Sequence, residues 1–125
     1  MFPRFTVRFP GSRVLVVEDE PLLALQVKMT LDEHGCLVVG PFAAVVPAMK
    51  AVNADRLDAA VLDINLGKEL SFPIADTLAA ANVPFVFLTA YNRAVLPLAH
   101  RHRLVLPKPF RAEALLAELA EMVPS

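Results

Sequence analysis

Five short apolar runs divide this chain, and a longer segment with helix-forming character follows each of them. The runs are rich in Val, Leu, Ala and Phe, and each is shorter than a typical helix. Unbroken apolar runs, unlike alternating ones, are typical of strands that a parallel sheet buries on both faces. The expected strands are 13–17, 36–40, 59–63, 84–89 and 104–106.

Start and stop signals mark the segments between these runs as helices. The first has Pro21 at its start and a glycine just beyond its end, where helices favour these residues. A loop that holds Gly67 leads to Ser71, a candidate N-cap of the third helix. Pro47 and Pro97 weaken the second and fourth helices, because an internal proline removes a backbone hydrogen bond. The expected helices are 21–33, 43–53, 73–81, 92–103 and 112–123.

Strand and helix therefore alternate along the whole chain, which predicts an α/β fold. We expect a doubly wound, five-stranded parallel sheet with right-handed crossovers and helices on both faces. A chain of 125 residues, 56% of them hydrophobic, suffices for one domain with a well-buried core. We assign the domain to residues 12–125 and residues 1–11, where aromatic and basic side chains alternate, to an N-terminal arm. If Met1 is the native start, we expect this domain to stand alone.

Composition and charge limit the classes of partner and the cellular location that we expect for this chain. The net charge of −1 gives no indication of direct nucleic-acid binding or of a membrane surface as partner. No stretch approaches the roughly 20 apolar residues that span a bilayer, and the arm lacks the apolar centre of a secretion signal. The single cysteine, Cys36, excludes an internal disulfide and agrees with a reducing cytoplasm.

Polar residues follow four of the expected strands at the point where each strand ends. Residues 18–20 are Glu-Asp-Glu, and the others are Asp63, Thr89 and Lys108. Because the carboxyl ends of parallel strands meet at one edge of the sheet, where ligands bind, we expect these side chains to share a pocket. Each signal alone has an ordinary explanation: a solvated acidic loop, an aspartate that caps a turn, a strand threonine and a surface lysine. Together, in this order, they predict a site.

The residue types at this edge predict phosphoryl chemistry that depends on Mg²⁺. At roughly 4 Å and an effective dielectric constant of about 20, each close pair of acids costs about 4 kcal/mol. A divalent cation relieves that repulsion, and ligands that are all oxygen favour Mg²⁺. Asp63 is the candidate nucleophile, since carboxylates form aspartyl phosphates. The Thr89 hydroxyl and the Lys108 ammonium suit phosphoryl oxygens, and Pro109 makes a cis peptide after Lys108 possible.

Four motifs give the chain a resemblance to the receiver domain of bacterial two-component response regulators. They are VLVVEDE at 14–20, VLDINL at 61–66, FLTAY at 87–91 and LPKPF at 106–110. The resemblance covers roughly residues 12–123 and implies a flavodoxin-like sheet with strand order 2-1-3-4-5. It also implies phosphate transfer from a sensor histidine kinase or phosphotransfer protein, and signalling to a downstream regulatory protein.

The resemblance assigns the members of a magnesium site and the phosphoacceptor. It implies that Asp63 accepts phosphate from a phosphohistidine and that Asp19 and Asp63 ligate Mg²⁺ directly. Glu18 would act through a metal-bound water, and the backbone carbonyl of Asn65 would complete the site. Lys108 would pair with the phosphoryl group. This agrees with phosphoryl transfer in general, where the protein positions groups and neutralises charge.

The switch region departs from the usual receiver pattern. The resemblance implies that Thr89 moves to bond the phosphoryl group, but the usual switch aromatic, three residues before the lysine, is Val105 here. Tyr91 follows Thr89 by two residues, which is similar to the single-domain subgroup nicknamed for its FAT-GUY motif, although the subgroup's glycine is Ala90. We hypothesise that Tyr91 takes over the switch or shields the acyl phosphate from water.

Two other functions fit parts of the pattern. An aspartate-nucleophile phosphohydrolase would use Asp63, but it needs a substrate cap and usually an acid where this chain has Asn65. A receiver fold that serves as an interaction module without phosphorylation has no reason to keep mutually repelling acids. We therefore expect a phosphoacceptor with slow autodephosphorylation rather than an enzyme.

Overall fold

A five-stranded parallel sheet forms the centre of the computed structural model, which describes residues 9–90 and 96–123. The strand order is β2-β1-β3-β6-β7. Because β6 and β7 are the fourth and fifth strands of this sheet, the predicted fold class and the order 2-1-3-4-5 are confirmed. The strands are β1 (Arg13–Val17), β2 (Leu37–Phe42), β3 (Ala59–Asp63), β6 (Phe85–Thr89) and β7 (Leu104–Pro107).

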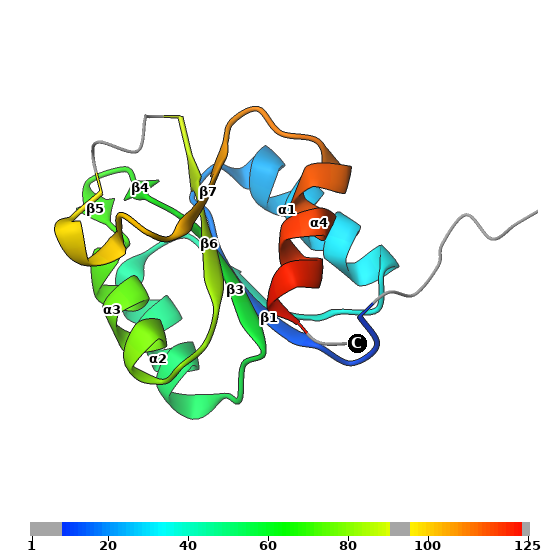
Figure 1. The fold of residues 1–125 in the computed structure, drawn as a ribbon, viewed down its shortest axis with the longest axis horizontal. Helices are drawn as coiled ribbons and strands as arrows, with labels where there is room; N and C mark the ends of the chain where they lie inside the picture. The colour runs from blue at the N-terminus through cyan, green and yellow to red at the C-terminus, as the bar shows by residue number, and fades with distance from the viewer. Residues whose placement is uncertain (1–8, 91–95, 124–125) are drawn as a thin grey trace, which may run out of the picture.

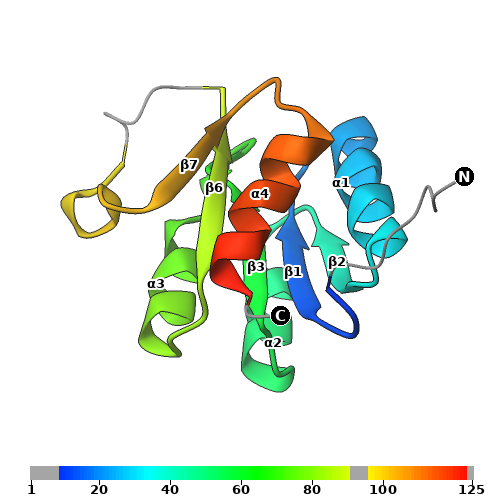
Figure 2. The ribbon, with the colours of Figure 1, turned by 45° about the vertical axis from the view of Figure 1, so that its right-hand side comes forward.

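Helices cover both faces of this sheet (Figure 1). On one face lie α1 (Pro21–Glu33) and α4 (Ala112–Met122), and on the other lie α2 (Val45–Ala54) and α3 (Phe72–Ala80). Figure 2, turned by 45°, shows α4 in front of the sheet beside α1. Within the described residues, no helix has both the length and the apolar character needed to cross a membrane.

The core consists of two apolar layers, one on each face of the sheet. Val14 and Val16 of β1 pack on the α1–α4 side, whereas Leu15 and Val17 pack on the α2–α3 side. All four side chains are fully buried, as the unbroken apolar runs predicted. Phe9, from the predicted arm, joins the α1–α4 layer, and its N–H donates to the His34 carbonyl at 3.0 Å. Residues 1–8 of that arm lie outside the described residues.

The predicted helix at 92–103 is wrong for the part that the structure describes. Residues 96–103 hold a 3-10 helix, η2 (Leu98–His100), and turns. Pro97, directly before η2, has an extended ψ of 155°, which a helix through this position does not allow. Residues 91–95 lie outside the described residues.

A buried histidine attaches η2 to the rest of the domain. His100 is 3% exposed, and its Nε2 lies 2.7 Å from Oδ1 of Asp76 on α3. Its ring lies 6.3, 6.0 and 5.9 Å from the rings of Phe72, Phe85 and Phe87. His100 thus holds η2 against the domain through one polar contact to α3 and ring contacts with three phenylalanines.

A short hairpin after β3 was not predicted. Where we expected a loop, β4 (Asn65–Leu66) pairs antiparallel with β5 (Glu69–Leu70). Gly67 has a φ of +77° in the turn, a conformation that glycine adopts without strain. A two-residue connection that begins with glycine is a known hairpin signal, so the pattern was available in the sequence.

Several element boundaries differ from the predictions by a few residues. Helix α2 begins at Val45, so Pro47 falls in its first turn, where no backbone donor is needed. Strand β2 continues to Phe42 instead of ending at residue 40. Ser71 is the N-cap residue of α3, but its side chain makes no capping hydrogen bond.

Candidate functional site

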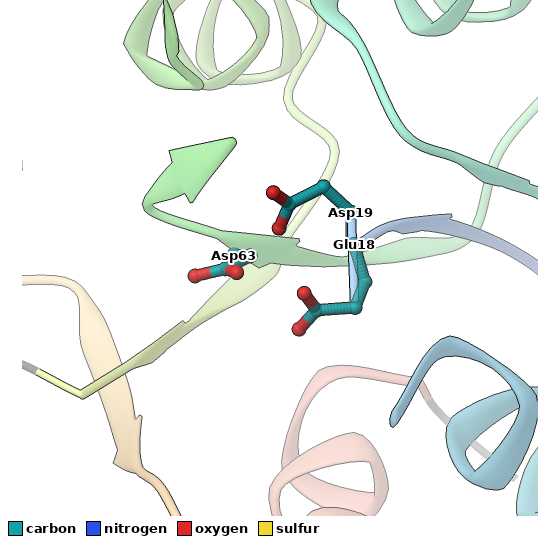
Figure 3. Close-up of side chains that lie close together, drawn as sticks. All are labelled: Glu18, Asp19 and Asp63. Carbon is teal, nitrogen blue, oxygen red and sulfur yellow. The ribbon is translucent and has the colours of Figure 1, made fainter. Parts of the chain in front are cut away.

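Three carboxylates meet at the carboxyl edge of the sheet, as the strand ends predicted. Glu18 and Asp19 follow β1, and Asp63 is the last residue of β3. One carboxylate oxygen from each lies within 4.8 Å of the others. Figure 3 shows the three side chains directed toward a common space. Glu18 and Asp63 are buried, at 2% and 5% exposure.

Backbone contacts fix the position of Glu18. Its N–H donates to the Phe42 carbonyl at 2.9 Å, and its Oε2 accepts the N–H of Glu20 at 3.0 Å. The first contact depends on the path of β2, which shifts register between Leu15 and Val17. Gly40 makes this path possible, since a Cβ there would lie 2.8 Å from the Val16 carbonyl oxygen.

Burial disfavours the charged form of Glu18. Desolvation, followed by its interaction with Asp63, raises the pKa of Glu18 from 4.5 to about 7. A carboxyl group that is half protonated near neutral pH binds a cation more tightly as the pH rises. Uptake of a cation by this carboxylate would therefore release a proton.

Lys108 bridges the two buried acids. Its Nζ lies 2.9 Å from Oδ2 of Asp63 and 2.9 Å from Oε1 of Glu18. Burial lowers the pKa of Lys108, but its interactions with Asp63 and Glu18 outweigh burial, so the pKa is raised overall. The Lys108 N–H donates to the Thr89 carbonyl at 2.8 Å, and the Lys108–Pro109 peptide is cis, as the sequence allowed.

Other predicted site residues lie around this centre. Thr89 ends β6 and is 1% exposed. Asn65 begins β4, and its N–H donates to Oδ1 of Asp63 at 3.3 Å. Val105 lies on β7 and packs against the α2–α3 layer. Tyr91, the predicted switch residue, lies outside the described residues.

The donor set of this pocket fits Mg²⁺. Carboxylate oxygens surround the common space, and Glu18 Oε1 is buried with an ion pair to Lys108 but no directed hydrogen bond among the described residues. Such an oxygen suits a metal-bound water, and hard oxygen ligands are those that Mg²⁺ takes. The sequence did not predict the closeness of Gly67, where a Cβ would lie 3.5 Å from Oδ2 of Asp19.

Comparison with known proteins identifies the family. The family model described as "Response regulator receiver domain" matches residues 14–120, and the chain belongs to this family. It is therefore a receiver domain of two-component signalling, a class of domain that interacts with histidine kinases and downstream effectors.

Solved receiver structures agree with this fold. SdrG from Sphingomonas melonis Fr1 is 38% identical, with a TM-score of 0.78 over 90% of this chain and 96% of SdrG. A further solution structure, of the BeF3-activated conformation of SdrG from Pseudomonas melonis Fr1, is also 38% identical, with a TM-score of 0.73 over 89% of this chain and 95% of that one. The receiver domain of sensor histidine kinase PA1611 from Pseudomonas aeruginosa PAO1 was crystallised with a magnesium ion in its active site cleft. It is 25% identical, with a TM-score of 0.76 over 92% of this chain and 99% of that one.

A curated regulator also matches part of the chain. The phyllosphere-induced regulator PhyR from Methylorubrum extorquens is 29% identical over 89 residues, which is 69% of this chain and 33% of PhyR. The chain thus spans about a third of the length of this relative.

Proposed function

We propose that this chain is a phosphoreceiver that accepts a phosphoryl group on Asp63 in a Mg²⁺-dependent reaction. The observation that supports this most directly is the placement of the Asp63 carboxylate, which is buried, held by Lys108 at 2.9 Å and within 4.8 Å of two further acids. The SdrG structure in a BeF3-activated conformation and the magnesium ion of PA1611 support the same chemistry in relatives.

The proposed reaction transfers phosphorus from nitrogen to oxygen. A carboxylate oxygen of Asp63 attacks the phosphorus of a phosphohistidine, the P–N bond breaks, and the imidazole leaves with a proton from solvent. Lys108 neutralises charge on the transferring oxygens. Asp19, Asp63 and the Asn65 carbonyl would hold Mg²⁺ directly and Glu18 would do so through water, and the ion would supply further charge neutralisation when bound.

The proposed phosphodonor is a sensor histidine kinase or a phosphotransfer protein, and the proposed recipient of the signal is a downstream regulatory protein. The domain acts alone, through protein contacts, in the cytoplasm, where its buried thiol Cys36 stays reduced. It does not turn over a substrate, apart from slow loss of its own phosphoryl group.

Thr89 and Tyr91 are the proposed switch residues. Thr89 ends the strand next to β7, so a shift of its side chain toward the phosphoryl group would change the packing between these strands. Tyr91→Ala tests the second residue by two readouts, the autodephosphorylation rate and the affinity for the partner. If neither changes, Tyr91 has neither role.

The decisive experiment is incubation with a small phosphodonor, with and without Mg²⁺, followed by intact mass measurement. We expect the wild-type chain to gain one phosphoryl group only with Mg²⁺, and Asp63→Asn to gain none. Asp32→Asn, at an exposed acid on α1, is the matched control and should behave as wild type. Steady turnover of a phosphate ester would instead support the phosphohydrolase, for which Asn65 occupies the place of the second acid.

A further inference from the structure

A side chain from the hairpin caps the start of helix α2. The N–H of Val45, the first residue of α2, donates to Oε2 of Glu69 at 3.1 Å. The N-cap residue of this helix is Ala44, which has no side-chain acceptor. Glu69, 24 residues away in sequence, therefore supplies the acceptor that the local sequence lacks.

The same hairpin lies against the acidic pocket. Its first residue, Asn65, donates its N–H to Asp63, and its turn residue, Gly67, lies beside Asp19. Asn65 pairs with Leu70, and Leu66 pairs with Glu69 across the hairpin. Leu66 is buried at 5% exposure, so it anchors the strand that carries Asn65. A movement of Asn65 would therefore reach Glu69 through Leu66 or Leu70, one residue further along the hairpin.

We propose that Glu69 is a positioning residue that couples the Asp63 pocket to the N-terminus of α2. This inference rests on the proposed function, because the state that it transmits is occupation of the pocket by Mg²⁺ and a phosphoryl group. The route matters in this chain because Val105 stands on β7 where the receiver resemblance implies a switch aromatic. Val46 and Leu70, the sequence neighbours of Val45 and Glu69, are 62% and 50% exposed. A change in the Glu69 contact would therefore alter an apolar part of the surface that a partner can contact.

The proposed coupling means that the Glu69–Val45 contact is stronger when the pocket is occupied. Coupling is reciprocal, so loss of this contact should weaken Mg²⁺ binding by the factor by which occupation strengthens the contact. We would titrate Mg²⁺ alone into the labelled protein and follow backbone amides by NMR. Glu69→Ala removes the acceptor and should raise the Mg²⁺ dissociation constant roughly threefold to tenfold. Glu69→Gln keeps an acceptor oxygen and should restore most of the affinity. Lys68→Ala, on the same turn, should match wild type.

A second variant removes the donor rather than the acceptor. Val45 is the first helical position, which favours proline, and Ala44 before it is extended (φ −145°, ψ 161°), as a residue before proline must be. Val45→Pro therefore deletes the N–H and keeps the helix start. We expect its effect on Mg²⁺ affinity to resemble that of Glu69→Ala, and the double variant to be no weaker than either single variant.

The activated state gives an independent readout. Mg²⁺ with beryllofluoride should shift the Val46 amide signal in the wild type and in Lys68→Ala, but less in Glu69→Ala. Equal Mg²⁺ affinity of Glu69→Ala and wild type, or additive effects in the double variant, would overturn the coupling while leaving the phosphoreceiver intact. If the wild type itself binds neither probe, the proposed function fails and the coupling with it.

Discussion

Charged side chains lie at both ends of strands β1 and β3, and they are partly exposed at one end and buried at the other. At the amino end, Arg13 contacts Asp55 at 3.1 Å, with 32% and 36% of the side chains exposed. At the carboxyl end, Lys108 contacts Glu18 and Asp63 at 2.9 Å, and 18%, 0% and 7% of these three side chains are exposed. Similar ion pairs thus sit in very different surroundings within one sheet.

The balance of charge differs as well. Two arginines face two aspartates at the amino end, whereas one lysine faces three acids at the carboxyl end among the described residues. Exposed, balanced pairs contribute little free energy and do no harm. Buried, unbalanced acids lower the stability of the metal-free domain. The difference supports the proposed cation site at the carboxyl end, and four predictions test it, from the largest expected effect to the smallest.

The largest effect should come from removing the buried lysine charge. Lys108→Met leaves Glu18 and Asp63 without a counter-charge and should lower the free energy of unfolding by roughly 3–5 kcal/mol without Mg²⁺. Lys28→Met, which breaks an exposed α1 pair with Asp32, is the control and should cost under about 1 kcal/mol. Denaturant unfolding at neutral pH measures both. Equal losses in the two variants would refute the contrast between buried and exposed pairs.

Mg²⁺ should stabilise the carboxyl end and not the amino end. At a hundredfold excess over its dissociation constant, Mg²⁺ should raise the free energy of unfolding by about 2.7 kcal/mol. Asp19→Asn should abolish most of this gain, and Asp55→Asn, at the amino end, should keep it. Thermal melts with and without Mg²⁺ provide the measurement. If Asp19→Asn keeps the gain in stability, Mg²⁺ binds at another site.

The stability of the metal-free domain should fall as the pH rises. The pKa of Glu18 is about 7 in the folded state against 4.5 as its ordinary value, so the folded state binds more protons between these values. Its contribution is present in full below pH 4.5 and is lost as the pH rises through 7, at about 1.4 kcal/mol between pH 6 and pH 8. Glu18→Gln should lack this loss. If the free energies of unfolding of the two proteins change in parallel with pH, Glu18 is not the cause of the loss.

The smallest effect should come from the amino end. Asp55→Asn breaks the half-exposed pair with Arg13, which keeps its bond from Nε to the Arg56 carbonyl. We expect a loss of about 0.2–1 kcal/mol that shrinks with added salt, without any change in Mg²⁺ affinity. A loss as large as that of Lys108→Met would show that the two ends do not differ.

The strand ends and their acids could be predicted because both depend on local sequence. An unbroken apolar run indicates a buried strand, and the direction of parallel strands then places Glu18, Asp63 and Lys108 at one edge. The bridging of two acids by Lys108 could not be predicted, since it depends on side-chain rotamers set by packing. The contact between Glu69 and Val45 could not be predicted either, because it joins two segments that only the fold brings together.

The predicted helix at 92–103 failed because helix-forming composition says little about a segment that contains Pro97. Tertiary contacts determine the backbone conformation there, and His100 contacts Asp76 on α3 and Phe87 on β6. The hairpin at 65–70 was missed because two-residue strands are too short for a periodic pattern to register.

The attachment of η2 through His100 has a consequence for how this domain can open. The His100 imidazole joins η2 to α3 through Asp76 and to β6 through the Phe85 and Phe87 rings. Arg103 adds a cation–π contact to Phe85 at 4.7 Å. Local opening of residues 98–103 has to break both sets of contacts, so a substitution at position 100 should speed amide hydrogen exchange in that stretch while the sheet stays closed.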